Sequence, residues 1–351
     1  MNFLTRRRVI TFAVAGAGTA LFALLGLPLP FLFGPMTACL VAALAGLRLQ
    51  GAGQVSVAAR TILGVAVGAS VTPELLGQLP QMAGTIALVP LYIALIGLVG
   101  VPFFRRVCGL DPVTSYYAAM PGGLQDMVIF GQEAGGDVRA LSLIHATRVL
   151  IIVTIVPLIL SAFYGVGLTN PIGAPVAETP IKEIAFMVIA ALVGWKGGEK
   201  IGLFGASILG PMIVTAILSL ADVIHVRPPA EAILTAQFFI GMGIGIYYVG
   251  ITLRELRNIV AAGVAFVLLL AVLTAIFTEA VVLTGLGPPV ESFLAFAPGG
   301  QAEMTVLAIV AGADLGFVIV HHLTRIILVI TGAPVVARLI LKREKDPGGG
   351  P

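Results

Sequence analysis

Two short runs of glycine, proline and polar residues hold the side chains of this sequence that could do chemistry. An apolar segment follows each run and carries an aspartate, a histidine and an arginine at matching positions. The first set is Pro121, Gly122, Gly123, Gln125, Asp126, Asp137, His145 and Arg148, and the second is Pro298, Gly299, Gly300, Gln301, Glu303, Asp314, His322 and Arg325. The matching prolines, acids, histidines and arginines all lie 177 residues apart. This constant interval indicates an internal duplication.

The acids Asp126 and Glu303 each follow a Pro-Gly-Gly run by three residues. In the first turn of a helix, an acid stabilises the positive end of the helix dipole. At membrane depth, a carboxylate can instead carry a proton, bind a cation or pair with a buried arginine. The two roles are compatible, and we favour a role of both acids in coupling transport to a cation.

Arg148 and Arg325 each lie eleven residues after an aspartate, which is about 16 Å along a helix. This rise places each guanidinium near the centre of a bilayer, on nearly the same helical face as the aspartate. An arginine there must face water or a partner, because exposure to lipid is costly. The partner is either Asp126 or Glu303, in a structural ion pair, or an anionic substrate. The aspartates, Asp137 and Asp314, are expected to be helix N-caps.

His145 and His322 stand three residues before the two arginines. They are either buried core histidines or parts of a proton relay. Arg60 and Gln237 are secondary candidates that also lie 177 residues apart, in apolar segments. Each precedes by four residues a Gly-x-x-x-Gly pair, which predicts close helix packing. The pairs are Gly64 with Gly68 and Gly241 with Gly245.

The composition is that of a polytopic membrane protein. Of 351 residues, 58% are hydrophobic and 11% charged, and the mean hydropathy is +1.08. A soluble domain carries about 25% charged residues. At roughly 20 residues per span, the chain has room for about ten to twelve membrane segments and no sizeable soluble domain. No direct nucleic-acid partner is expected, because the net charge of +3 sits mainly at the ends and in short loops.

The apolar segments form two sets of six. They are 9–28, 32–49, 55–72, 83–104, 112–135 and 137–163 in the first set, and 181–195, 203–222, 229–249, 257–284, 288–312 and 314–341 in the second. We therefore predict a membrane repeat over 1–163, an inter-repeat loop over 164–180, a second membrane repeat over 181–341 and a cytoplasmic tail over 342–351. Neither Cys39 nor Cys108 has a context that predicts a disulfide.

The fifth segment of each set is interrupted by Pro-Gly-Gly, so it is either a broken crossing helix or a re-entrant hairpin. Short loops rich in lysine and arginine stay in the cytoplasm. Treating both fifth segments as hairpins places both termini and every basic loop except that of Arg227 on the cytoplasmic side. The predicted fold is an all-α polytopic membrane protein of two inverted repeats. Each repeat has about five transmembrane helices and one re-entrant hairpin, as in secondary transporters.

The repeated Gly-Pro-Met at Gly34 and Gly210, the paired Pro-Gly-Gly runs and the His-x-x-Arg segments resemble the AbrB membrane-protein family in its duplicated Gram-negative form. The resemblance covers about residues 9–341. Members carry the labels membrane regulator of gene expression, transcriptional regulator and ammonia monooxygenase. The resemblance implies these labels and supplies no mechanism.

Three functions fit these observations. The favoured one is a secondary transporter of the bacterial inner membrane that carries a small anion coupled to protons or sodium, with a homodimer as a further expectation. The second is a membrane sensor that affects gene expression indirectly, without transport. The third is a metal-dependent monooxygenase, which needs several histidine or carboxylate ligands to converge. Only four histidines are present, so we predict no enzyme activity, no bound metal and no cofactor beyond the coupling ion.

Overall fold

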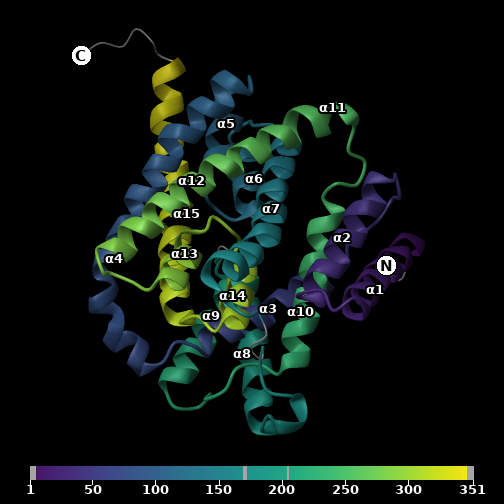
Figure 1. Ribbon diagram of the computed structural model, residues 1–351, viewed down its shortest axis with the longest axis vertical. Coiled ribbons are helices and arrows are strands. Elements are labelled where there is room, and N and C mark those ends of the chain that lie inside the picture. The colour runs from purple at the N-terminus through teal and green to yellow at the C-terminus, as the bar shows by residue number, and fades with distance from the viewer. Residues whose placement is uncertain (1–4, 169–171, 204, 346–351) are drawn as a thin grey trace. The chain divides into compact units, whose positions relative to one another are not determined.

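The structure is a computed structural model, which describes residues 5–168, 172–203 and 205–345 (Figure 1). The described residues form helices and loops, with no strand among them, so the all-α prediction is confirmed. Residues 169–171 of the predicted inter-repeat loop and 346–351 of the predicted tail lie outside the described residues.

Each predicted apolar segment corresponds to a helix or to two helices in sequence. The first set contains α1 (Arg6–Leu24), α2 (Pro30–Leu44), α3 (Gln54–Gly68), α4 (Pro73–Pro102), α5 (Pro112–Ala119), α6 (Leu124–Glu133) and α7 (Val138–Tyr164). The second contains α8 (Ile181–Lys200), α9 (Ala206–Leu220), α10 (Ala230–Ile246), α11 (Leu253–Glu255), α12 (Ala261–Leu283), α13 (Pro289–Phe296), α14 (Gln301–Ala311) and α15 (Leu315–Lys345). Helix α15 therefore includes 342–345, the first residues of the predicted tail.

Five helical stretches among the described residues are long and apolar enough to cross a membrane. They are Arg6–Leu24, Pro73–Val107, Val138–Tyr164, Leu253–Leu283 and Leu315–Leu339. Shorter apolar helices accompany them, including α2, α3, α9 and α10. These helices indicate a membrane protein, as the composition does. The number of crossings in each repeat and the orientation of the termini stay predictions.

Both predicted interruptions are present in the structure. Helix α5 ends at Ala119, and α6 begins at Leu124, which leaves the four residues Met120–Gly123 as a first break. The second break is Ala297–Gly300, between α13 and α14. The backbone of Met120 is extended there, with ψ of 132°. The cause is local, because the proline that follows has no N–H and disfavours a helical conformation at the residue before it.

The two halves of the first interrupted segment fold back on one another. The backbone N–H of Asp137, just after α6, donates to Oγ1 of Thr114 in the first turn of α5 at 2.8 Å. Farther along the two helices, the ring centroids of Tyr117 and Phe130 are 6.5 Å apart. These contacts make α5 and α6 antiparallel, with the first break at the turn between them.

The chain forms two compact units, and neither coincides with a repeat. The first unit consists of Met1–Leu79, Pro157–Ile251 and Thr305–Gly316. The second consists of Pro80–Val156, Thr252–Met304 and Phe317–Pro351. Each unit therefore draws helices from both predicted repeats.

Within the first unit, helices from the two predicted repeats pack against each other reciprocally. Helix α2 packs against α1 and α10, and α9 packs against α8 and α3. A Cβ on Gly64 of α3 would overlap with the carbonyl oxygen of Ile208 in α9. In the same way, a Cβ on Gly241 of α10 would overlap with the carbonyl oxygen of Leu32 in α2. The predicted close packing at the Gly-x-x-x-Gly pairs is confirmed, and backbone of the neighbouring helix occupies the space of the missing side chain.

We expect Gly241→Ala to destabilise the protein by about 1–3 kcal/mol, since its methyl group must displace the backbone of α2. Gly243→Ala, in the same helix, is the control, because nothing lies within 4 Å of a Cβ at Gly243. Thermal unfolding of the two variants in detergent measures the difference. Equal melting temperatures would contradict the close approach of α2 and α10.

The loop between α9 and α10 contains a histidine held by two carboxylates. Nδ1 of His225 lies 2.9 Å from Oε1 of Glu183, and Nε2 lies 3.1 Å from Oδ1 of Asp222. The hydrogen bond with Glu183, followed by the interaction with Asp222, raises the pKa of His225 above its usual value. Both ring nitrogens must carry protons to donate to both carboxylates, so the arrangement favours the imidazolium.

This raised pKa predicts a pH-dependent contribution to stability. The contribution is fully present below the unfolded-state pKa of about 6.5 and is lost as pH rises through the higher folded-state value. Melting temperature measured from about pH 5 to pH 9 should therefore fall more steeply for the wild type than for His225→Gln. Parallel curves for the two proteins would show that the histidine contributes nothing through its charge.

Candidate functional site

The two breaks and the two arginines of the His-x-x-Arg segments belong to the second unit. Arg148 lies in α7 and Arg325 in α15, and only 2% and 3% of their surfaces are exposed. Arg148 also interacts electrostatically with Arg325, with Glu303 and with Tyr92. The structure thus brings most of the predicted site residues together in one unit.

Each guanidinium donates to the backbone of its own break. Nη1 of Arg148 donates to the carbonyl oxygen of Met120 at 3.1 Å, and Nη2 donates to that of Gly122 at 2.6 Å. Arg325 repeats the arrangement, with Nη1 donating to Ala297 at 2.9 Å and Nη2 to Gly299 at 2.7 Å. A break frees carbonyl groups at the negative end of the preceding half-helix, and a cation there is favourable. Both arginines thus donate to backbone carbonyls and not to carboxylates.

The two histidines contact backbone carbonyl oxygens of the same half-helices, one turn before the acceptors of the arginines. Nε2 of His145 lies 3.1 Å from the carbonyl oxygen of Tyr117, and Nε2 of His322 lies 2.9 Å from that of Leu294. Nη2 of Arg325 also lies 3.1 Å from Nδ1 of His322. Since a guanidinium can only donate, that contact makes Nδ1 the acceptor and assigns the proton of a neutral His322 to Nε2.

The acids lie over the glycines of the breaks. A Cβ on Gly123 would overlap with the carboxylate of Asp126, and a Cβ on Gly300 would overlap with that of Glu303. Each acid is in the first turn of its half-helix, α6 or α14. The carboxylates therefore fold back toward the positive ends of these helices. A glycine at the last position of each break leaves the space that this conformation needs.

Two buried cations of like charge are therefore held in one unit. The two guanidiniums repel each other, and the Nε atom of each is buried without a hydrogen-bond partner. Nδ1 of His145 is buried and without a partner too. An anion near the two guanidiniums would relieve the repulsion and satisfy their Nε–H donors, which is the usual use of arginine in anion recognition.

The sequence interpretation missed two residues beside the second break. The hydroxyl groups of Tyr92 and Thr274 lie 2.9 Å apart, and Oγ1 of Thr274 donates to the carbonyl oxygen of Phe296 at 3.3 Å. Tyr92 also packs edge-on against Phe296. A sequence signal existed, because Tyr92 and Thr274 are polar residues in the middle of the apolar segments 83–104 and 257–284.

The other candidates are placed as follows. Oδ1 of Asp137 accepts from the backbone N–H groups of Arg139 and Ala140, so Asp137 is the N-cap of α7. Asp314 precedes α15 and belongs to the first unit, together with Arg60 and Gln237. The remaining candidates do not alter the site: Gln237 is fully buried, Gln301 begins α14, and the side chain of Gln125 lies outside the described part of the structure.

Metal ligation finds no support among the described residues, which contain no group of three or more His, Cys, Asp or Glu side chains placed to hold an ion. The monooxygenase hypothesis is not tested by this observation.

Comparison with known proteins gives one matching family and two relatives. The family model described as "Transition state regulatory protein AbrB" matches residues 31–341. A Bacillus subtilis (strain 168) protein named "Uncharacterized protein YhjN" is 27% identical over 300 residues, which cover 80% of this chain and 77% of the relative. An Escherichia coli (strain K12) protein named "Putative regulator AbrB" is 25% identical over 330 residues, which cover 90% of both chains.

The carbonyl contacts predict that Arg148→Lys is not a conservative change. A single ammonium group cannot reproduce the two parallel bonds to Met120 and Gly122, so one buried carbonyl loses its partner at a cost of about 1–3 kcal/mol. Arg139→Lys is the matched control, because Arg139 is 40% exposed and pairs with Glu255 at the surface, where such pairs contribute about 0–1 kcal/mol. Unfolding midpoints measure both, and equal losses would refute the bridging role of Arg148.

Proposed function

We propose that this chain, which belongs to the AbrB family and has the apolar helices of a membrane protein, is a secondary transporter of the bacterial inner membrane. Its solute is a small anion, and transport is coupled to protons or sodium. The proposal includes the predicted architecture of two inverted repeats. Each repeat has a re-entrant hairpin, and the break is the tip of that hairpin.

The antiparallel contact between α5 and α6 supports the re-entrant hairpin. The bond between Asp137 and Thr114 joins the two ends of this segment, and a re-entrant hairpin requires both ends to lie on one side of the bilayer. With both interrupted segments counted as hairpins, both termini and every basic loop except that of Arg227 would lie in the cytoplasm. Irregular backbone within a membrane is tolerated where protein buries it or where it lines a cavity.

The orientation can be tested by cysteine labelling after Cys39 and Cys108 are replaced by alanine. We expect Val176→Cys, in the inter-repeat loop, to react with a membrane-impermeant maleimide in intact cells. Lys200→Cys, at the end of α8, should react only after the cells are opened. The opposite pattern would overturn the inverted topology, and labelling of both sites in intact cells would show that α8 does not cross the bilayer.

The observation that carries the proposal is the pair of buried guanidiniums in one unit. Arg148 and Arg325 repel each other, and each keeps a buried Nε without a hydrogen-bond partner. The positive ends of α6 and α14 begin at the same two breaks. In transporters built from broken helices, half-helix N-termini point at anionic groups of the substrate. The arginines hold the breaks and supply positive potential for the solute.

The acids of the breaks are the proposed coupling groups. Glu303 acts electrostatically on Arg148, so a cation or proton on this carboxylate changes the potential at the arginine. Asp126 occupies the matching place at the first break. Binding of the anion would therefore raise the affinity for the cation, and binding of the cation would raise the affinity for the anion. This reciprocal effect is the thermodynamic basis of coupled transport.

The second candidate is a sensor that binds the same anion without moving it. The name of the Escherichia coli relative describes a regulator, and a regulatory effect of this chain would be indirect, through the ligand that it binds. No enzyme activity and no direct binding of nucleic acid are part of either proposal. A homodimer stays a prediction.

The site is tested by thermal unfolding of the purified protein with small mono-, di- and tricarboxylates, with and without sodium, at several pH values. A ligand present at 100 times its Kd stabilises the native state by about 2.7 kcal/mol. We expect a rise in melting temperature that is lost in Arg148→Gln and Arg325→Gln and kept in the exposed control Arg139→Gln. Glu303→Gln should keep the rise and lose its dependence on sodium or pH.

Uptake of the stabilising anion into proteoliposomes then separates the two candidates. Uptake that follows an imposed sodium or proton gradient supports transport, whereas binding without uptake supports the sensor. If no anion shifts the melting temperature of the wild type, the arginines are structural groups only, and the anion site is refuted.

A further inference from the structure

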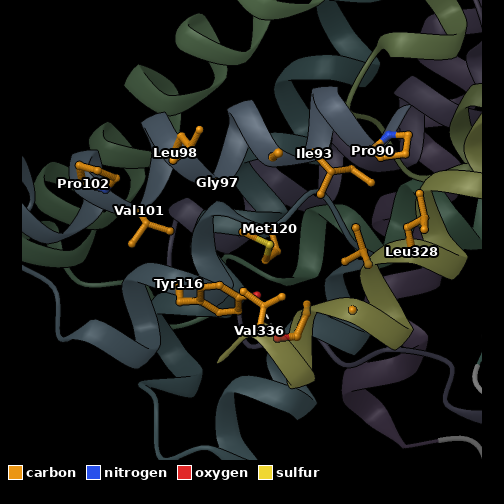
Figure 2. A pocket seen from close by; sticks show the side chains of 14 residues that line it. Pro90, Ile93, Gly97, Leu98, Val101, Pro102, Tyr116, Met120, Leu328 and Val336 are labelled. Carbon is orange, nitrogen blue, oxygen red and sulfur yellow. Dashed lines mark hydrogen bonds between the residues drawn. The ribbon is translucent and has the colours of Figure 1, made fainter. Parts of the chain in front are cut away.

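A cavity of about 610 Å³ lies beside the first break (Figure 2). This size is within the range of about 300–1,000 Å³ that is typical of ligand pockets. Its walls come from the second half of α4, the end of α5 and the C-terminal half of α15. They are formed by Pro90, Ile93, Ala94, Gly97, Leu98, Val101, Pro102, Tyr116, Met120, Leu328, Val329, Gly332, Ala333 and Val336.

The cavity offers no polar side chain to a ligand. The hydroxyl of Tyr116, its one polar side-chain group, already donates to the carbonyl oxygen of Ala333 at 2.9 Å. Both α4 and α15 belong to the stretches that can cross a membrane. Large apolar side chains on the same helices are exposed, among them Leu98 at 69% and Val336 at 43%. In a bilayer, such a surface is surrounded by hydrocarbon, so an acyl chain is the available occupant.

Beyond one end of the cavity, each of its two long helices leads to an arginine. Figure 2 shows Leu328 at the Pro90 end, so α4 and α15 run in the same direction along the cavity. Beyond Pro102, α4 leads to Arg106, and two residues beyond Val336 stands Arg338; both arginines are exposed. Basic residues at the edge of the hydrocarbon attract the headgroups of anionic lipids. We propose that the cavity binds one acyl chain of an anionic membrane phospholipid, with its headgroup beside Arg106 and Arg338.

The bound acyl chain would complete the packing around the first break. At the second break, Thr274 and Tyr92 supply a hydroxyl and a ring to Phe296. The residue 177 positions before Thr274 is Gly97, which has no side chain and faces the cavity. The side chain of Met120 lines the cavity, while its carbonyl oxygen accepts from Arg148. An acyl chain therefore contacts the residue that Arg148 holds, and its presence should stabilise the break.

Filling the cavity tests the proposal. Nothing lies within 4 Å of a Cβ at Gly332, so Gly332→Leu should fill the space from within, and Val336→Trp should fill it from the rim. Gly16→Leu is the control, because a Cβ there also has nothing within 4 Å and lies on another helix. Native mass spectrometry of the detergent-purified protein counts bound phospholipids, and added phosphatidylglycerol or phosphatidylcholine shows how melting temperature responds.

We expect the wild type and Gly16→Leu to retain one phospholipid more than either filled variant, and to gain melting temperature with phosphatidylglycerol more than with phosphatidylcholine. Arg338→Gln should keep the bound lipid and lose the preference for phosphatidylglycerol, whereas Arg254→Gln, an exposed arginine elsewhere, should keep both. Equal lipid counts in a folded Gly332→Leu protein and a folded Val336→Trp protein would overturn the proposal. So would a wild-type dimer that the filled variants convert to monomers, because the cavity would then be an interface between copies.

Discussion

Backbone carbonyl groups that lose their helical partners inside an apolar protein must find other donors, and this requirement organises the second unit. Each break frees carbonyl oxygens where lipid offers no hydrogen bond. Arginine meets the requirement with two donors in one rigid plane. The histidines continue the pattern, and every one of these four side chains reaches a carbonyl 28 residues earlier in the chain. A fixed offset of this kind aligns α7 with α5 and α15 with α13.

The same arginines carry the charge on which the proposed function depends. Two nitrogen atoms of each guanidinium donate to the backbone, so the group is held rigid and its other N–H groups, including Nε–H, are fixed in direction. Preorganised donors bind a charged ligand without first losing other partners. Holding two cations together without an anion is unfavourable, and the hydrogen bonds to four carbonyl groups offset part of this cost. Stability and anion affinity are therefore linked through the same side chains.

Much of this architecture is readable from the sequence, because it depends on local chemistry. Proline and glycine predict the breaks, apolar runs predict the helices, and an arginine far from any loop predicts a buried guanidinium. The acceptors of that guanidinium are not readable, since a search for charged partners leads to Asp126 and Glu303 and passes over the carbonyl oxygens of Met120 and Gly122. Tyr92 and Thr274 escape notice because isolated polar residues are common in apolar helices. The two compact units are hidden as well, because the helices that they combine are far apart in sequence.

The reciprocal packing of α2 with α10 and of α3 with α9 has a consequence for synthesis on the ribosome. Gly241 contacts Leu32, which is synthesised 209 residues earlier (241 minus 32). Gly64 can contact Ile208 only after 144 further residues have been synthesised (208 minus 64). Contacts of such long range form late and slowly. Helices α2 and α3 must therefore remain in the bilayer without these partners until α9 and α10 emerge, with lipid covering their contact faces. A translocon or insertase that shelters these faces would determine how much of the newly made chain reaches its final fold.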